Sequence, residues 1–444
     1  MPKLRNVFYS MGNFANTFCQ QVFSNRIQFY YLRVLGLDPG LVGAVWSIFG
    51  LWNAVNDPLM GQLSDRTRSR WGRRIPYILF GALPLGLSFF FLWTVPQASP
   101  LVMAGYFLAT VFIYDTLYTL LTVAYNSLFT EIATDVKQRS GLASLRESLA
   151  VVALLLAFII APILSRSVGF VVMGVIVGAI TAVGYAVSVI GNKEDPRHME
   201  ETPIGLRESL RLTLGSVPFR WYLGANLMKE YIYLILAATL PFWVEFGLGI
   251  KGPAAVFGTT LGAGDQEAVL LAVPFLLCIP CLALWRIVTP RIGSRRAWIL
   301  ASLLFIPGLT IMFFAHDFAI GLLGTSLIAP GLSGYMMLPI VVLSDVIDDD
   351  AHRVGVRREG IFFGISGAVA KLSFTAQGLF YWITFALTGW RSGADVQTES
   401  AVWGIRFMMA GSPLIAALIT IACLWFIRLR AADPRGQATP AVAK

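Results

Sequence analysis

Apolar runs of about 20 residues, separated by short polar loops, recur along the whole chain. A run of that length spans the hydrocarbon core of a bilayer, because a helix rises about 1.5 Å per residue. Of the 444 residues, 56% are hydrophobic and 13% are charged, whereas soluble chains carry roughly 25% charged residues. The pattern predicts an all-α membrane protein in contact with the lipid bilayer.

The apolar runs predict twelve transmembrane helices, an even number that places both termini on the same side of the membrane. We expect these spans near residues 8–35, 41–63, 75–95, 101–127, 147–165, 168–191, 220–247, 267–288, 297–315, 318–344, 360–389 and 402–428.

Basic residues are distributed unevenly among the predicted loops. Loops on the side of the termini hold 26 of the 34 Lys and Arg residues, whereas the opposite loops hold five. Cytoplasmic loops of membrane proteins carry such an excess. We therefore expect a plasma (inner) membrane protein with both termini in the cytoplasm. Because topology explains the net charge of +9, nucleic acid is not an expected partner.

The longest loop divides the chain into two sets of six spans. We expect an N-terminal bundle over 1–191, a cytoplasmic linker with a short amphipathic helix over 192–219, a C-terminal bundle over 220–430 and a cytoplasmic tail over 431–444. Segments 70–79 and 291–300 both place a glycine and paired arginines before an apolar helix. If this is a repeat and not chance similarity between basic loops, it favours the major facilitator fold of two six-helix bundles.

Polar residues cluster on the second predicted span. Asn53 and Asp57 are four residues apart and share one helical face, with Asn56 beside them. Carboxylate and amide oxygens suit a hard cation such as Na⁺, and a single carboxylate also suits a proton. Thr119 and Thr122 of the fourth span are further candidates for this cation site. The alternative is a hydrogen-bonded cluster between helices.

Two basic residues, Arg26 and Lys371, lie deep inside predicted spans. An ionised group costs about 2.5–3.5 kcal/mol at the centre of a span, so it usually faces a partner or a water-filled cavity. We expect both to contact an anionic or hydroxyl-rich solute, or Asp57; a structural salt bridge is the alternative. Lys229 and Glu230 also lie inside a span, but neighbouring helical residues point about 100° apart and need not pair.

The loop after the second span is more basic than topology requires. We expect a charge latch at the cytoplasmic side between this loop and the inner end of the tenth span, and a solvated loop is the alternative. The latch residues are Asp65, Arg66, Arg73 and Arg74 on one side, and Asp345, Asp348, Arg358 and Glu359 on the other.

Motifs for catalysis are missing from the sequence. It contains no Walker A loop, hydrolase triad or zinc motif, and its three histidines form no ligand pair. We therefore expect no enzyme activity, no metal site and no cofactor other than a coupling ion, H⁺ or Na⁺.

Several motifs resemble those of one known family. The glycoside–pentoside–hexuronide:cation symporters, relatives of melibiose permease in the major facilitator superfamily, have a similar signature at NDPLMG (56–61), SDRT (64–67) and RWGRRIP (70–76). Further matches are YSMG (9–12), YN (125–126) and DVID (345–348), and the resemblance covers roughly residues 5–430.

The resemblance implies a sugar-type solute carried together with a cation. It also implies that Asp57 belongs to the cation site and that Lys371 lies in the same region. The first acid of the family's pair is Asn53 here, and two other family carboxylates fall at Thr17 and Thr122. These neutral replacements shift the expected solute toward an anion, such as a uronic or sulfonated sugar, and put proton coupling on a par with sodium coupling.

Our leading hypothesis is a monomeric symporter that works by alternating access. Its expected substrate-binding residues are Arg26, Lys371, Arg146, Thr17, Asn16, Gln20, Tyr125 and Asn126; the resemblance places Arg146 beside the sugar. One alternative is a lysolipid or amphiphile transporter of the same fold, which a wide apolar opening would favour. The other is a non-transporting membrane sensor or assembly protein, which a filled central cavity would favour.

Overall fold

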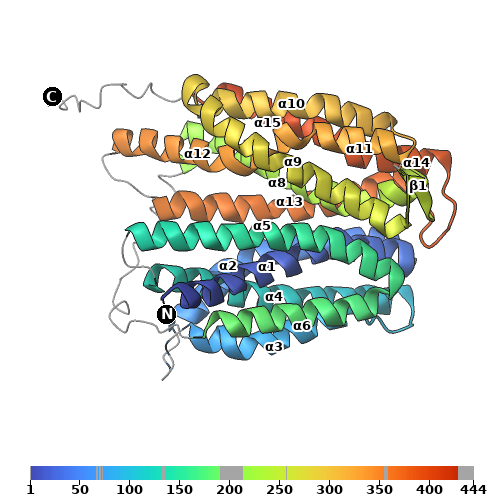
Figure 1. The fold of residues 1–444 in the computed structure, drawn as a ribbon, viewed down its shortest axis with the longest axis horizontal. Coiled ribbons are helices and arrows are strands. Elements are labelled where there is room, and N and C mark those ends of the chain that lie inside the picture. Colours follow the sequence, from blue (N-terminus) through green and yellow to red (C-terminus); the bar gives the residue numbers. More distant parts are fainter. Residues whose placement is uncertain are drawn as a thin grey trace.

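The computed structural model describes residues 2–66, 69, 72, 74–132, 136–190, 214–256, 258–354 and 359–428, with the side chains of some residues in these ranges excluded. Its helices run along one common direction (Figure 1). In chain order they are α1 (Pro2–Phe29) with η1 (Tyr30–Val34), α2 (Pro39–Arg66), α3 (Ile75–Phe91), α4 (Pro100–Ile132), α5 (Val136–Ser167), α6 (Phe170–Ser188), α8 (Val217–Phe242) with η3 (Trp243–Gly247), α9 (Ala263–Ile292), α10 (Ser294–Phe314), α11 (Phe318–Leu327), α12 (Ala329–Val354), α13 (Glu359–Thr388), α14 (Glu399–Arg406), η4 (Phe407–Gly411) and α15 (Ser412–Phe426).

These helices form the twelve predicted spans, because η1, η3 and η4 continue neighbouring helices and α11 runs into α12. Within the described residues, eight helical stretches are long and apolar enough to cross a membrane. The helices α1, α2 and α13 are not among those eight. They are the spans that carry Arg26, Asp57 and Lys371, so polar side chains interrupt their hydropathy where we predict function.

The spans pack as two bundles of six. In the first bundle, α1 packs on α5 and α6, α3 on α6, and α2 on α4; in the second, α8 packs on α13 and α15, and α12 on α9 and α10. Figure 1 shows the first bundle below and the second above. Contacts of α2 with α13, α5 with α9 and α1 with α8 join the bundles.

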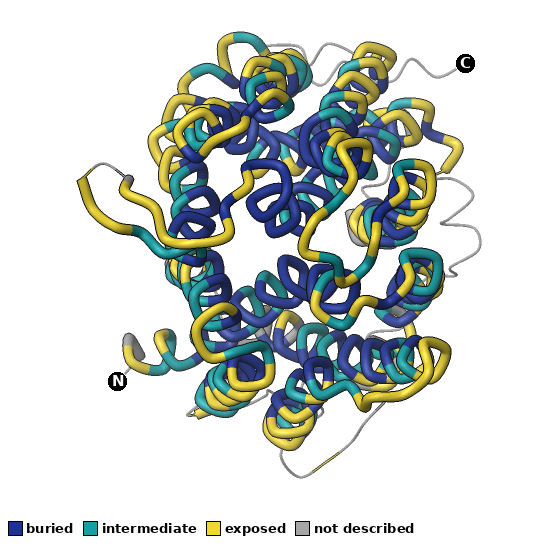
Figure 2. The backbone as a smooth tube through the Cα atoms, turned by 90° about the vertical axis from the view of Figure 1, so that its right-hand side faces the viewer, coloured by how far each residue is buried: buried dark blue, intermediate teal, exposed yellow. Residues whose placement is uncertain are grey.

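Large apolar side chains remain exposed on the outer faces of the helices. Leu83 is 64% exposed, and Ile113 and Leu284 are also exposed, while the buried residues lie toward the interior of the molecule (Figure 2). A soluble protein rarely leaves so much apolar surface uncovered. The outer surface is therefore suited to lipid, and the protein is an integral membrane protein.

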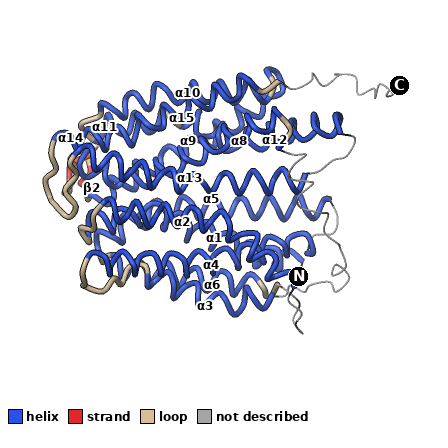
Figure 3. The backbone as a smooth tube through the Cα atoms, turned by 180° about the vertical axis from the view of Figure 1, so that it is seen from behind, coloured by secondary structure: helices blue, strands red, loops and turns tan. Residues whose placement is uncertain are grey.

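Three features differ from the sequence expectation or fall outside the described chain. Helix α5 begins at Val136 and not near residue 147, because its basic first turns extend the helix beyond the apolar run. An unpredicted antiparallel hairpin joins β1 (Ala254–Val256) to β2 (Thr259–Leu261) at the end opposite the start of α1 (Figure 3); strands of three residues give no periodic signal. The expected amphipathic helix and the tail lie outside the described residues.

Candidate functional site

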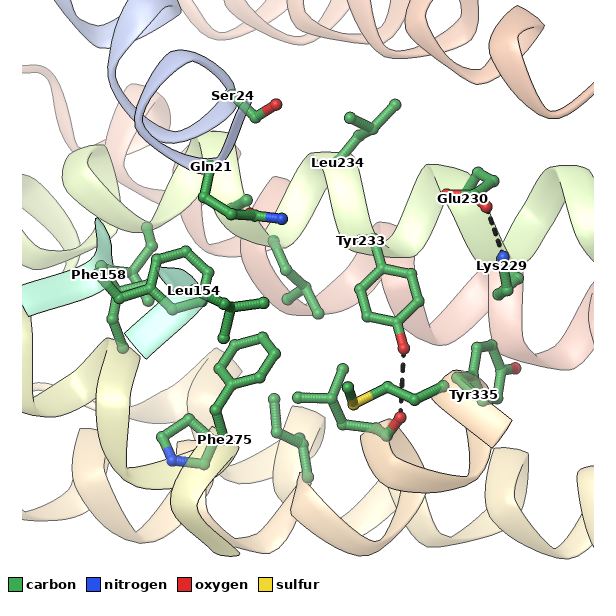
Figure 4. Close-up of a pocket in the computed structure, with 18 of the residues that line it drawn as sticks. Gln21, Ser24, Leu154, Phe158, Lys229, Glu230, Tyr233, Leu234, Phe275 and Tyr335 are labelled. Atoms are coloured by element: carbon green, nitrogen blue, oxygen red, sulfur yellow. Dashed lines mark hydrogen bonds and ion pairs between the residues drawn. The ribbon is translucent and has the colours of Figure 1, made fainter. Parts of the chain in front are cut away.

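A cavity of about 630 Å³ lies between the two bundles. Such a volume is in the range of small-molecule sites, about 300–1,000 Å³. One part of its wall is polar, with Gln20, Gln21 and Ser24 from α1, Lys229 and Glu230 from α8, and Lys371 from α13. Another part is apolar and includes Leu154, Phe158 and Phe275 (Figure 4).

Lys371 connects the cavity to the second span. Its ammonium group forms an ion pair with Asp57 and donates a hydrogen bond to the Asn53 carbonyl oxygen at 3.2 Å. The side chains of Lys371 and Asp57 are 23% and 46% exposed, so the protein does not fully enclose either charge. Because α2 and α13 belong to different bundles, this ion pair joins the two bundles beside the cavity.

Asp115, on α4, is a site residue that the sequence reasoning missed. It is 4% exposed, and its carboxylate accepts a hydrogen bond from Asn56 Nδ2 at 2.8 Å. Both Asp57 and Lys371 lie within electrostatic range of this carboxylate. The sequence alone could have indicated Asp115, because an acidic residue in the middle of a transmembrane span is by itself a candidate functional residue.

Replacing Asn56 with Ala is expected to lower the free energy of unfolding by about 1–3 kcal/mol, because the buried Asp115 carboxylate then loses its donor. Unfolding in detergent, followed by intrinsic fluorescence, measures the change. Adding Asp115→Asn to this variant should recover part of the loss, because a neutral amide costs less to bury. Equal stability of Asn56→Ala and wild type would contradict the assigned contact.

The structure does not place Arg26 on the cavity. Its side chain is 1% exposed, and its Nη2 lies 2.6 Å from Glu267 Oε1, on α9 of the other bundle. Glu267 is fully buried and also lies 3.2 Å from the Arg166 Nε of α5. The structural salt bridge is therefore the correct interpretation of Arg26 in this conformation, and the predicted substrate contact is not supported. Glu267 escaped notice because it stands at the first position of a predicted span, where acids are often interfacial.

A second set of ion pairs lies farther from the termini. The Arg33 guanidinium in η1 contacts Glu245 of η3 and Asp395, each at 2.7 Å. Together with Arg26, Arg166 and Glu267, these residues close the end of the molecule that lies opposite the start of α1. We call these six residues the distal gate: Arg26, Arg33, Arg166, Glu245, Glu267 and Asp395.

Contacts between the bundles are present from the distal gate to mid-span. They include Asn25 Nδ2 to the Ala237 carbonyl at 2.6 Å and Trp46 Nε1 to Gln377 Oε1 at 2.9 Å. The Lys371–Asp57 pair lies at mid-span and also joins the two bundles. The conformation is therefore closed at the distal end.

Several other predicted substrate residues are occupied by bonds within the first bundle. Asn16 Oδ1 accepts hydrogen bonds from the Thr122 and Tyr185 hydroxyls, both at 2.8 Å. Thr122, which we expected to share a cation with Asp57, therefore donates its hydroxyl hydrogen bond to Asn16 of α1. Tyr125 stacks on Tyr9 with ring centroids 4.5 Å apart, and each hydroxyl donates to the other residue's carbonyl oxygen.

Gln20 and Lys371 are the predicted substrate residues that line the cavity. The cavity wall does not include the other six predicted residues, which are Arg26, Arg146, Thr17, Asn16, Tyr125 and Asn126. The Arg146 guanidinium lies 5.5 Å from the Tyr125 ring centroid, and Asn126 is exposed. Among the predicted cation residues, Thr119 is buried at 3% exposure.

The predicted cytoplasmic latch is described only in part. The side chains of Asp65, Arg66, Arg73, Arg358 and Glu359 lie outside the described residues. Arg74 is 8% exposed, Asp345 accepts a hydrogen bond from Ser294 within its own bundle, and the Asp348 carbonyl oxygen contacts the His352 ring at 2.6 Å. The latch stays a prediction.

No group of three or more His, Cys, Asp or Glu side chains suited to a metal ion occurs among the described residues.

Comparisons with known proteins agree with this architecture. Residues 8–431 match the family model described as MFS/sugar transport protein. The isoprimeverose transporter of Lactiplantibacillus pentosus is 22% identical, with 98% of this chain and 90% of that protein covered. The glucuronide carrier protein homolog of Escherichia coli (strain K12) is 24% identical, with 95% and 92% covered.

A solved structure shares the fold. The inward-facing, unoccupied bacterial homolog of the human lysosomal transporter Spinster superposes with a TM-score of 0.68 at 16% identity, with 97% of this chain and 98% of that chain covered. The predicted major facilitator fold and the resemblance drawn from the loop motifs are both confirmed. The chain belongs to the MFS/sugar transport family of membrane transporters.

Proposed function

We propose that this protein is a cation-coupled symporter that moves a sugar or sugar-acid solute by alternating access. The observation that carries the proposal is the Lys371–Asp57 ion pair, which joins the two bundles and has its lysine on the cavity wall. Relatives named as an isoprimeverose transporter and a glucuronide carrier homolog support the solute class.

Coupling follows from competition for one carboxylate. A proton or Na⁺ that binds Asp57 takes the counter-ion away from Lys371. The freed ammonium group then turns to the cavity, where an anionic or hydroxyl-bearing solute replaces the lost partner. Cation and solute each make binding of the other more favourable, and this coupling is reciprocal. An ion without a solute would leave a charge unpaired inside the membrane, at a cost of a few kcal/mol.

The excess of basic loops on the side of the termini supports a cytoplasmic location for that side. With this orientation, in the plasma membrane, the distal gate is extracellular, and the conformation described above is closed on the extracellular side. The protein would act as a monomer, because the proposed ion site and cavity are complete within one chain.

Asp57→Asn is expected to reduce gradient-driven accumulation of the solute at least tenfold, because an amide neither takes up a proton nor forms an ion pair with Lys371. Uptake into proteoliposomes under a Na⁺ or pH gradient measures this, with labelled methyl β-D-glucuronide and methyl β-D-glucoside as probes. Asp38→Asn is the matched control: it lies at the distal end of the same span and accepts a backbone hydrogen bond from Gly40 that an amide also accepts. Undiminished accumulation by Asp57→Asn would contradict the coupling role.

The apolar part of the cavity wall also suits a second candidate function, which is the transport of a lysolipid or another amphiphile. Uptake of fluorescent lysophosphatidylcholine that exceeds uptake of both pyranosides would favour it. A non-transporting sensor is not favoured, since side chains do not fill the central cavity.

A further inference from the structure

Lys229 and Glu230 form an ion pair on the cavity wall that the coupling scheme does not use. Both residues belong to α8, and their side chains are 16% and 33% exposed. Figure 4 shows the two side chains bent toward each other, and Gln21 and Ser24 of α1 also line this cavity. Glu230 has no other hydrogen-bond or ion-pair partner among the described residues.

Packing does not explain this pair. Adjacent residues on a helix do not face each other, so the pair gains little for the helix itself. The Arg26–Glu267, Arg33–Glu245 and Lys371–Asp57 pairs each join the two bundles, whereas Lys229–Glu230 joins nothing. Ionised residues inside a membrane protein are costly and typically mark a solute or ion pathway.

We propose that Lys229 and Glu230 recognise the hydroxyl-bearing end of the transported solute. This inference rests on the proposed function and adds a binding pair on the second bundle to it. Glu230 accepts hydrogen bonds from neighbouring hydroxyl groups of a pyranose, and Lys229 donates to its ring or acid oxygens. Neither residue follows from the family motifs, which place the sugar contacts mainly in the first bundle.

The opposite wall defines the rest of the solute. Phe158 of α5 and Phe275 of α9 have ring centroids 4.9 Å apart, and together with Leu154 they line the cavity. This wall comes from both bundles and offers no charge. A pyranose bound at Lys229 and Glu230 therefore presents its apolar face or an apolar substituent to these rings.

The test compares three variants of the purified full-length protein. Glu230→Gln removes the charge, Glu230→Asp is the conservative change, and the double variant Lys229→Glu with Glu230→Lys keeps an ion pair but exchanges its ends. Binding of methyl β-D-glucuronide and of its monodeoxy analogues is measured by calorimetry, and thermal unfolding of each variant reports its fold.

Glu230→Gln is expected to weaken binding of methyl β-D-glucuronide by about ten- to one-hundredfold, the loss typical of a hydrogen bond to a charged group. In the wild type, removal of one or two particular hydroxyls should weaken binding to a similar extent. In Glu230→Gln the same deoxy analogues should bind as the parent sugar does. The exchanged pair should unfold like the wild type yet bind as weakly as Glu230→Gln, and Glu230→Asp should recover part of the binding.

Two outcomes would overturn the inference while the symport proposal stands. The first is wild-type affinity of Glu230→Gln for methyl β-D-glucuronide. The second is wild-type affinity of the exchanged pair, because it would show that binding needs a pair with no net charge but not this order of the two residues. Undiminished gradient-driven accumulation by Asp57→Asn, together with the expected effects at Glu230, would overturn the symport proposal alone. If neither methyl β-D-glucuronide nor methyl β-D-glucoside bound the wild type, both proposals would fall.

Discussion

Replacing Glu267 with Gln is expected to open the distal gate. The carboxylate is fully buried between Arg26, at 2.6 Å, and Arg166, at 3.2 Å. Loss of one partner from a buried ion pair costs about 3–5 kcal/mol, because the remaining charge is left without compensation. Separation of the bundles at this end would let water reach both guanidinium groups. The balance between the two conformations should therefore shift toward the distally open one by about two to three orders of magnitude.

Distances between spin labels measure this shift. Val168 in the first bundle and Ile320 in the second are exposed at the distal end, and labels there should gain a population at longer separation. Glu399→Gln is the matched control, because Glu399 is an exposed acid in the first turn of α14 at the same end. It should leave the label distances as in the wild type.

A double variant separates loss of the charge pair from general damage. Arg26→Gln combined with Glu267→Gln replaces the buried pair by two neutral amides, which can hydrogen-bond to each other and leave neither member of the pair as an unpaired buried charge. Arg166, which is 25% exposed, retains access to water. The double variant should therefore return toward the wild-type distances. Unchanged label distances in Glu267→Gln would show that the buried cluster does not hold the gate shut.

The order and position of the spans followed from the sequence because hydropathy is a local property. Most spans are long and apolar enough to be recognised without knowledge of their neighbours, as α9 and α10 illustrate. The sequence also predicted that Asp57 and Lys371 lie in one region. Charges inside a membrane require partners, and the resemblance to the symporter family places both residues near the cation site. Asp115 was within reach of the same rule and was overlooked beside Thr119 and Thr122.

Partners across the bundles were not predictable in the same way. Arg26 and Glu267 are far apart in the chain, and nothing local in the sequence states that α1 and α9 approach at that depth. The predicted substrate residues Asn16 and Tyr125 were expected to be free to bind a solute, but the packing of the first bundle pairs them with Thr122 and Tyr9. Periodicity locates a polar residue on a helix, whereas only packing decides what it contacts.

Gly50→Leu is expected to exclude the conformation described here. Gly50 of α2 lies against Thr375 of α13, and a Cβ at this position would lie 2.5 Å from the Thr375 backbone nitrogen. Gly43 and Gly378 form the same kind of close contact along these two helices, with a Cβ at Gly378 lying 2.9 Å from Trp46 Cβ. Small residues let membrane helices approach closely, and this seam is the broadest contact between the bundles.

The effect of Gly50→Leu should appear in both structure and transport. Backbone on α13 cannot rotate away as a flexible side chain would, so α2 and α13 must separate. A larger side chain in a packed interface destabilises it by about 1–3 kcal/mol, and by more where the new side chain clashes with backbone atoms. We expect solute exchange across proteoliposomes to fall at least tenfold, because alternating access requires both conformations. Gly105→Leu is the matched control, since Gly105 on the outer face of α4 has open space around its missing Cβ and a leucine there improves helix propensity. Exchange by Gly50→Leu at the rate of Gly105→Leu would mean that the two helices do not need this close contact during the transport cycle.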